Sequence, residues 1–180
     1  MNPVAPPDRP PSAAEARAEV EARRAAERAE REAAFRALHG DRTPGRWILV
    51  ASWVSTVLLT VVTVLAALDP DDAIGAFFAV AVAWFFLGSA LFALVVVLAA
   101  GRSRESSMGI GGLFLLAGSA PRSVQRNLIG SLLVQLVVSI AGAAVRPFTP
   151  LAFGTLAPIL PLALCGLWGV LHGRFPPRGS

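Results

Sequence analysis

The sequence contains no lysine, no tyrosine and only one cysteine, Cys165. All 16 positive charges are therefore arginines, and the isoelectric point near 11.2 reflects the lack of groups that titrate at intermediate pH, because the net charge is only +4. A basic isoelectric point of this origin does not indicate nucleic-acid binding. The single cysteine excludes an internal disulfide framework and a cysteine-based metal site within one chain. The exclusive use of arginine, with abundant Ala, Gly and Pro, favours a GC-rich bacterial genome.

Charge is also missing from several long stretches of the chain. The sequence is 54% hydrophobic and its mean hydropathy is +0.61, both above the range of ordinary soluble domains. A hydrocarbon core of ~30 Å is crossed by about 20 apolar residues in a helix. We therefore predict four transmembrane helices within residues 46–178, at about 47–68, 73–100, 122–145 and 150–172. The apolar segment 108–118 is too short to span and is expected to lie at the interface or to re-enter the bilayer.

The segment before the first span differs in composition. Residues 1–11 contain five prolines, which predicts a disordered tail. Residues 12–40 are rich in Ala, Glu and Arg, and Ser12 and Glu15 have the spacing of a capping box. The predicted helix carries six Arg and six Glu up to His39, and this balance argues against a DNA-binding arm and against adhesion to anionic lipid. Two interpretations follow, a solvated charged helix or a docking and weak self-association helix.

The expected fold is thus all-α, a four-span transmembrane bundle with a long charged cytoplasmic helix at its N-terminus. Two spans carry polar stripes. Ser52, Thr56, Thr60 and Thr63 lie near one face of the first span, and Asn127, Ser131, Gln135 and Ser139 recur every four residues in the third. Small polar residues in spans mark helix contacts, and the alternative is a polar path. Gln135, near the middle of its span, is expected to bond to another helix, a backbone carbonyl or water in a cavity.

Two prolines interrupt the fourth span. Pro158 and Pro161 cannot donate hydrogen bonds toward the carbonyls of Gly154 and Ala157, so a kink or a loosened turn is predicted there. Broken helices of this kind build transporter sites, although prolines also occur in spans that only pack.

Reactive side chains are scarce. No acidic residue lies within any predicted span, and the sequence shows no cluster of His, Cys, Asp and Glu, so we predict no enzyme, no metal site and no cofactor. Asp69, Asp71 and Asp72 surround Pro70 and are interpreted as a helix start with Asp69 as its cap, in preference to a calcium site, which would need more ligands. Cys165 and His172 are two helical turns apart, about 10.5 Å, which is too far for a nucleophile and its base.

The arginines near the spans are unevenly distributed. Eight lie next to the spans on the side of the membrane where both termini are predicted: Arg42, Arg46, Arg102, Arg104, Arg122, Arg126, Arg174 and Arg178. The other side has only Arg146 and the three aspartates. The positive-inside rule then predicts a multi-pass protein of the bacterial plasma membrane with both termini in the cytoplasm, and with Trp47 and Trp168 as anchors at the inner interface.

The last 60 residues contain Arg146-Pro-Phe-Thr-Pro-Leu-Ala-Phe-Gly154, Gly166-Leu-Trp-Gly169, His172-Gly173 and Phe175-Pro-Pro-Arg178. In these motifs the chain resembles a group of small integral membrane proteins from actinobacteria whose function is unassigned. The resemblance implies an actinobacterial plasma membrane, and it implies no catalytic or binding residue.

Two functions are therefore expected. The first is a non-enzymatic accessory or scaffold component of a membrane assembly, which contacts membrane lipid and meets a protein partner through residues 12–40 or 101–120. The second is a small oligomeric transporter or channel that uses the Gln135 stripe and the break at Pro158 and Pro161. Neither function involves nucleic acid, and self-association into a homo-oligomer is compatible with both.

Overall fold

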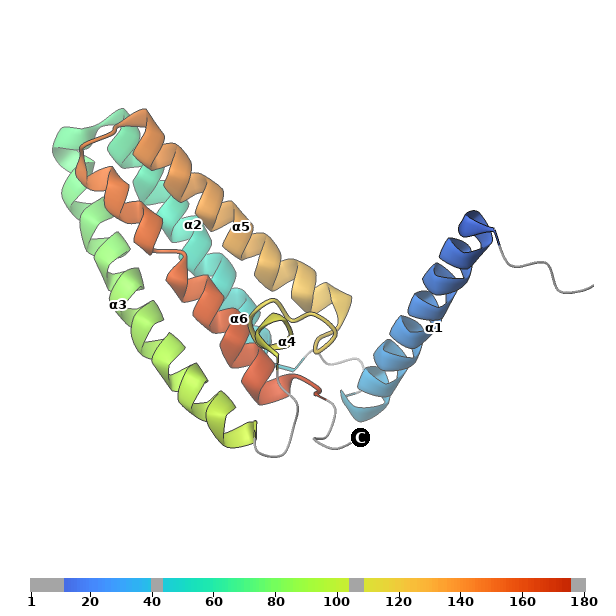
Figure 1. Ribbon diagram of the computed structural model, residues 1–180. Coiled ribbons are helices and arrows are strands. Elements are labelled where there is room, and N and C mark those ends of the chain that lie inside the picture. The colour runs from blue at the N-terminus through green and yellow to red at the C-terminus, as the bar shows by residue number, and fades with distance from the viewer. Residues whose placement is uncertain (1–11, 40–43, 104–108, 176–180) are drawn as a thin grey trace, which may run out of the picture. The chain divides into compact units, whose positions relative to one another are not determined.

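The computed structural model describes residues 12–39, 44–103 and 109–175, and within these ranges its secondary structure consists of helices and turns, without strands (Figure 1). The elements are α1 (Ala13–His39), α2 (Arg46–Leu68), α3 (Pro70–Arg102), α4 (Ile110–Phe114), α5 (Arg122–Val145), the 3-10 helix η1 (Pro150–Leu156) and α6 (Ile159–His172). They form two compact units, which divide between Asp41 and Arg42. The predicted proline-rich tail, residues 1–11, lies outside the described residues.

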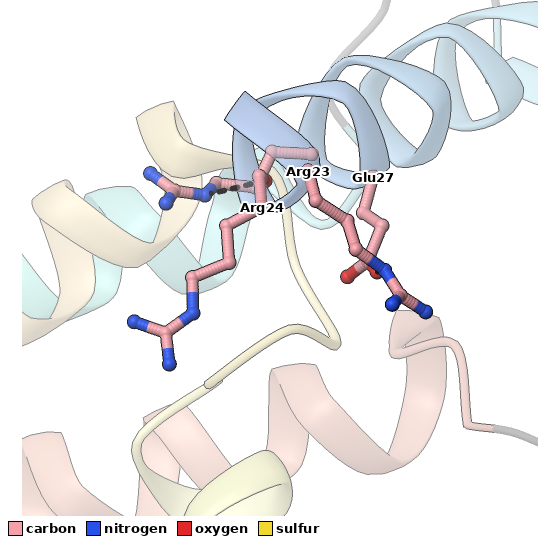
Figure 2. Close-up of polar contacts among 4 residues, drawn as sticks. Arg23, Arg24 and Glu27 are labelled. Carbon is pink, nitrogen blue, oxygen red and sulfur yellow. Dashed lines mark hydrogen bonds and ion pairs between the residues drawn. The ribbon is translucent and has the colours of Figure 1, made fainter. Parts of the chain in front are cut away.

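Helix α1 begins at a capping box. The Ser12 amide donates to Glu15 Oε2 at 2.7 Å, and the Glu15 amide donates to Ser12 Oγ at 3.3 Å. The hydrogen bond from the Ser12 backbone, followed by that from its side chain, lowers the pKa of the exposed Glu15 carboxyl. Farther along the helix, Arg23 Nε lies 3.3 Å from Glu27 Oε1, one turn away (Figure 2). Charges on this helix therefore pair along its own surface.

The long helices of the second unit run alternately in opposite directions and form an up-and-down bundle (Figure 1). The segments Arg46–Leu68, Pro70–Arg102, Arg122–Val145 and Pro150–His172 are each long and apolar enough to cross a membrane. The predicted all-α fold is confirmed, with four helices whose length and apolar composition would allow them to cross a membrane. Helix α3 is longer than the predicted span and starts at Pro70. As predicted, Asp69 is the N-cap of α3 and Pro70 lies in the first turn; the Asp69 side chain makes no capping hydrogen bond, and its backbone carbonyl accepts from Ala73 N at 3.2 Å.

The segment η1–α6 forms the centre of the bundle. Within its apolar stretch 67% of residues are buried, against 17% in α3, and it contacts α2, α3, α4 and α5. Trp168 lies in this buried helix, and its Nε1 donates to the Pro44 carbonyl at 3.0 Å. The prediction that Trp168 anchors at the interface is therefore wrong, since the indole is fully buried. The side chain of Trp47 is 59% exposed, as a tryptophan in contact with the membrane interface would be.

The predicted interruption at Pro158 and Pro161 is present in a tighter form than expected. The chain runs as the 3-10 helix η1 up to Leu156 and becomes α-helical only at Ile159. The Gly154 carbonyl accepts from Ala157 N, and the Ala157 carbonyl accepts from Leu160 N, both at 3.1 Å. The predicted kink or loosened turn takes the form of this change from 3-10 to α-helix, in which donors three residues later occupy the carbonyls that the prolines leave.

Helix α4 and the loop after it pack against α6. Leu113 and Leu116 are buried, and a Cβ added at Gly169 would lie 2.5 Å from the Leu113 carbonyl oxygen. Ser119 fixes the loop, because its hydroxyl donates to the Gly112 carbonyl and its own carbonyl accepts from Arg174 N. The described part of segment 108–118 is therefore held on the protein at the end of α6 (Figure 1).

Candidate functional site

The polar stripes of the first and third spans face each other across the contact between α2 and α5. Ser52 and Thr56 on α2, and Ser131 and Gln135 on α5, are each at most 1% exposed. Both pairs are spaced four residues apart, so each lies on one helix face over a single turn. We call these four residues the α2–α5 polar cluster.

The first contact of the cluster joins two serines. Ser52 Oγ and Ser131 Oγ are 2.5 Å apart. Ser131 Oγ also donates to the Leu128 carbonyl of its own helix at 2.9 Å. Because a hydroxyl has one proton, Ser131 accepts from Ser52, and the hydrogen bonds run in one direction from α2 through Ser131 to the α5 backbone.

The second contact joins Thr56 and Gln135, whose Oγ1 and Oε1 atoms are 3.2 Å apart. The Thr56 hydroxyl also lies 2.9 Å from the Ser52 carbonyl and 3.4 Å from the Ser131 carbonyl. The Thr56 hydroxyl can donate to the Gln135 amide oxygen or to either carbonyl, and through the amide oxygen it joins α2 to α5.

Two buried polar atoms on α5 have no partner among the described residues: Gln135 Nε2 and Ser139 Oγ. Their residues are 0% and 1% exposed. Ser139 lies beyond the cluster, where α5 approaches η1, and a Cβ added at Gly154 would be 3.9 Å from its Cα. This part of α5 is the one place in the described bundle where unpaired polar atoms of neighbouring turns are buried together.

The remaining residues singled out in the sequence do not join the cluster. Thr60 and Thr63 donate to the carbonyls four residues earlier in α2, at 2.7 and 2.6 Å. Asn127 donates to the Ser123 carbonyl at 2.8 Å and is partly exposed. Pro158 and Pro161 are buried between η1 and the start of α6. The stripes thus contribute two residues from each helix to the interhelical contact. Thr60, Thr63 and Asn127 bond within their own helices, and Ser139 Oγ has no partner among the described residues.

Several interhelical hydrogen bonds were not predicted from the sequence. Trp84 Nε1 donates to the Ser55 carbonyl at 3.2 Å and joins α3 to α2. Arg102 Nη1 donates to the Val170 carbonyl, and Arg146 donates through Nε and Nη2 to the Ala67 carbonyl at 3.2 and 3.0 Å. An arginine at the end of a span can indicate such a hydrogen bond, since its guanidinium group can reach the last carbonyls of a neighbouring helix, which lack donors within that helix.

The described residues contain no group of three or more His, Cys, Asp and Glu side chains that could hold a metal ion. Asp69, Asp71 and Asp72 are exposed at the start of α3, and Cys165 is buried in α6 without a disulfide. What the α2–α5 polar cluster can do chemically is to donate and accept hydrogen bonds. Comparisons with protein-family models, with curated proteins and with solved structures found no match to this chain.

Proposed function

We propose that this protein is a non-enzymatic structural component of a membrane assembly, in which the bundle anchors a partner-binding helix at the membrane. The observation that carries the proposal is the use of the polar stripes. Ser52, Thr56, Ser131 and Gln135 bond to one another across two helices, in the manner of small polar residues that hold spans together. Polar side chains committed to helix contacts in this way do not line a path for solutes.

Helix α1 is the partner-binding element of this proposal. Its described side chains are almost all exposed, and its six arginines and six glutamates cancel in charge. Figure 2 shows Arg23 turned to Glu27, while the guanidinium of Arg24 extends away from the helix. A balanced surface with outward arginines suits a protein partner better than anionic lipid or nucleic acid. The segment 101–120 is the second candidate partner-binding segment.

The proposed location is a bacterial plasma membrane with both termini in the cytoplasm. The support is the grouping of arginines at one end of the bundle, where Arg46, Arg102, Arg122, Arg126 and Arg174 occur, against Arg146 alone at the other. Arg42, Arg104 and Arg178 lie outside the described residues. A reporter enzyme fused after Ser180 is expected to be active only if it works in the cytoplasm, and activity of a periplasm-dependent reporter at that site would contradict this orientation.

The alternative, a small oligomeric transporter or channel, is favoured by a different observation. Gln135 Nε2 and Ser139 Oγ are buried without partners in an apolar bundle, where unpaired polar groups are costly. Such atoms could contact a passing solute. Ser139 lies beside Gly154 of η1, close to the interruption of the fourth span.

The substitution Gln135→Leu separates the two functions, with Thr60→Val as a control that changes a polar residue outside the cluster. Purified protein is reconstituted into vesicles, and water, glycerol, urea and proton permeation are followed by light scattering and an internal pH dye. We expect wild-type vesicles to match empty ones. Permeation above that level that disappears in Gln135→Leu, with the fold intact, would contradict the structural proposal.

The assembly itself is tested with a tagged full-length chain and a chain lacking residues 1–40. Both are extracted in mild detergent, and the mass of each complex is measured. We expect the full-length chain to carry a defined protein partner that the shortened chain loses. A full-length chain that is extracted as an isolated protein, without partner or second copy, would contradict the proposed role.

A further inference from the structure

Two residues other than glycine have a left-handed backbone in the described part of the chain, Leu116 with φ 56° and Phe148 with φ 65°. This conformation is uncommon for residues with a large side chain and must be held by the surrounding structure. Leu116 is 0% exposed, so burial of its side chain offsets the strain. Phe148 is 103% exposed and has no such compensation from the described residues.

The turn that carries Phe148 is held firmly. On one side, Arg146 donates twice to the Ala67 carbonyl at the end of α2. On the other side, the Thr149 hydroxyl donates to the Arg146 carbonyl at 2.7 Å and accepts from Leu151 N at 3.4 Å, which caps η1. The polar side chains of the turn, Arg146 and Thr149, hold its shape, and the Phe148 ring is left fully exposed.

The ring stands at the end of the bundle where α2 and α5 finish. Leu68 and Val145, the last residues of these helices, are 77% and 65% exposed. Together with Phe148 they continue the exposed apolar faces of α2 and α5, which include Val64 and Ile140. Exposed apolar side chains along spans that end in an aromatic residue have the composition of a bilayer boundary.

We propose that Phe148 inserts into the boundary between headgroups and acyl chains and fixes this end of the bundle in the bilayer. The turn strains the backbone at one residue, and the lipid replaces the water that would otherwise surround a fully exposed ring. The inference rests on the membrane location of the four spans and is independent of the proposed partner-binding role.

Spin labels at single cysteines test this insertion in phosphatidylcholine vesicles. The label is placed at Phe148→Cys, at Val137→Cys on the exposed face of α5 as the lipid reference, and at Asp71→Cys on the adjacent turn as the water reference. The unsubstituted chain controls for reaction at the buried Cys165. Accessibility to oxygen, which partitions into lipid, is compared with accessibility to a water-soluble nickel chelate.

We expect the label at position 148 to resemble that at 137, with raised oxygen accessibility and lowered nickel accessibility relative to position 71. A label at 148 that behaves like the one at 71 would overturn the proposal. Low accessibility to both reagents, with spin–spin broadening between copies, would assign Phe148 to a protein contact and overturn it also. If the label at 137 is itself in water, the spans do not cross the bilayer and the proposal fails with them.

Discussion

Helices α2 and α5 are joined by side-chain hydrogen bonds, whereas α3 and α6 are joined mainly by close approach of their backbones, with one side-chain hydrogen bond, from Arg102 to the Val170 carbonyl, at their end. In the first pair, serine, threonine and glutamine meet within the α2–α5 polar cluster. In the second, Gly88 of α3 lies against Ile159 and Leu160. A Cβ added at Gly88 would be 2.6 Å from the Leu160 backbone nitrogen, so only glycine allows this approach.

The difference shows two solutions to one physical problem. Lipid tails are as apolar as leucine, so burial of apolar surface does not drive helices together inside a bilayer. Association then depends on van der Waals packing, which small residues increase, and on interhelical hydrogen bonds. The α3–α6 contact uses the first and the α2–α5 contact uses the second. We expect the packed contact to be the less tolerant of substitution.

The largest effect is expected for Gly88→Ala. The added methyl group meets backbone atoms that cannot rotate away, and overpacking of this kind costs about 1–3 kcal/mol. Gly75→Ala in the same helix is the matched control, since nothing lies within 4 Å of the position of its Cβ. The free energies of unfolding are measured by denaturant titration in mixed micelles. Equal stability of the two variants would show that α3 and α6 are not in close contact.

A smaller effect is expected from the polar contact. A double-mutant cycle of Ser52→Ala and Ser131→Ala removes the 2.5 Å hydrogen bond with little change in volume. Interhelical hydrogen bonds in membranes have coupling energies of about 0.6 kcal/mol on average, with a maximum of about 1.7. We expect a coupling in this range in the same titrations. A coupling equal to or above the cost of Gly88→Ala would reverse the ranking of the two contacts.

The smallest effect is expected for the solvent-exposed hydrogen bonds between Ser12 and Glu15 at the start of α1. The Ser12–Glu15 capping box of α1 lowers the Glu15 pKa from its usual 4.5 in the folded helix. The ionised Glu15 carboxylate therefore stabilises the helix fully at pH values above the pKa of Glu15 in the unfolded chain. This stabilisation is lost as the pH falls through the lower pKa of Glu15 in the folded helix. The Ser12 amide resonance is expected to shift over this acidic range.

Glu15→Gln serves as the control for this titration. Glutamine can keep the reciprocal hydrogen bond, but it does not titrate. The Ser12 resonance of this variant is expected to stay nearly constant, and a shift equal to that of the unsubstituted chain would assign the titration to another glutamate.

The limits of sequence reasoning differ between elements. The four spans were predictable because the length and hydropathy of a run are local properties, and α5 has the predicted bounds, Arg122–Val145. The polar stripes indicated which faces of α2 and α5 are buried. They did not indicate that Asn127 and Thr60 bond to their own helices, because short polar side chains have backbone carbonyls within reach four residues earlier.

The burial of Trp168 and the 3-10 form of η1 could not be read from the sequence. A tryptophan near the end of a span usually lies at the interface, and here the Pro44 carbonyl and the central position of α6 hold it inside. The prolines indicated where the fourth span is interrupted. The carbonyls of Gly154 and Ala157 found donors three residues later, an outcome that depends on packing against α3 and α5.

The order of amino acids is enough to predict apolar helices long enough to cross a membrane, because each residue's affinity for lipid or water acts along the chain without reference to the fold. Only the tertiary structure decided which helices meet and by what means. Hydrogen bonds and backbone contacts between spans depend on distances of a few ångströms between residues up to 79 positions apart, such as Ser52 and Ser131. Packing of the whole bundle sets those distances.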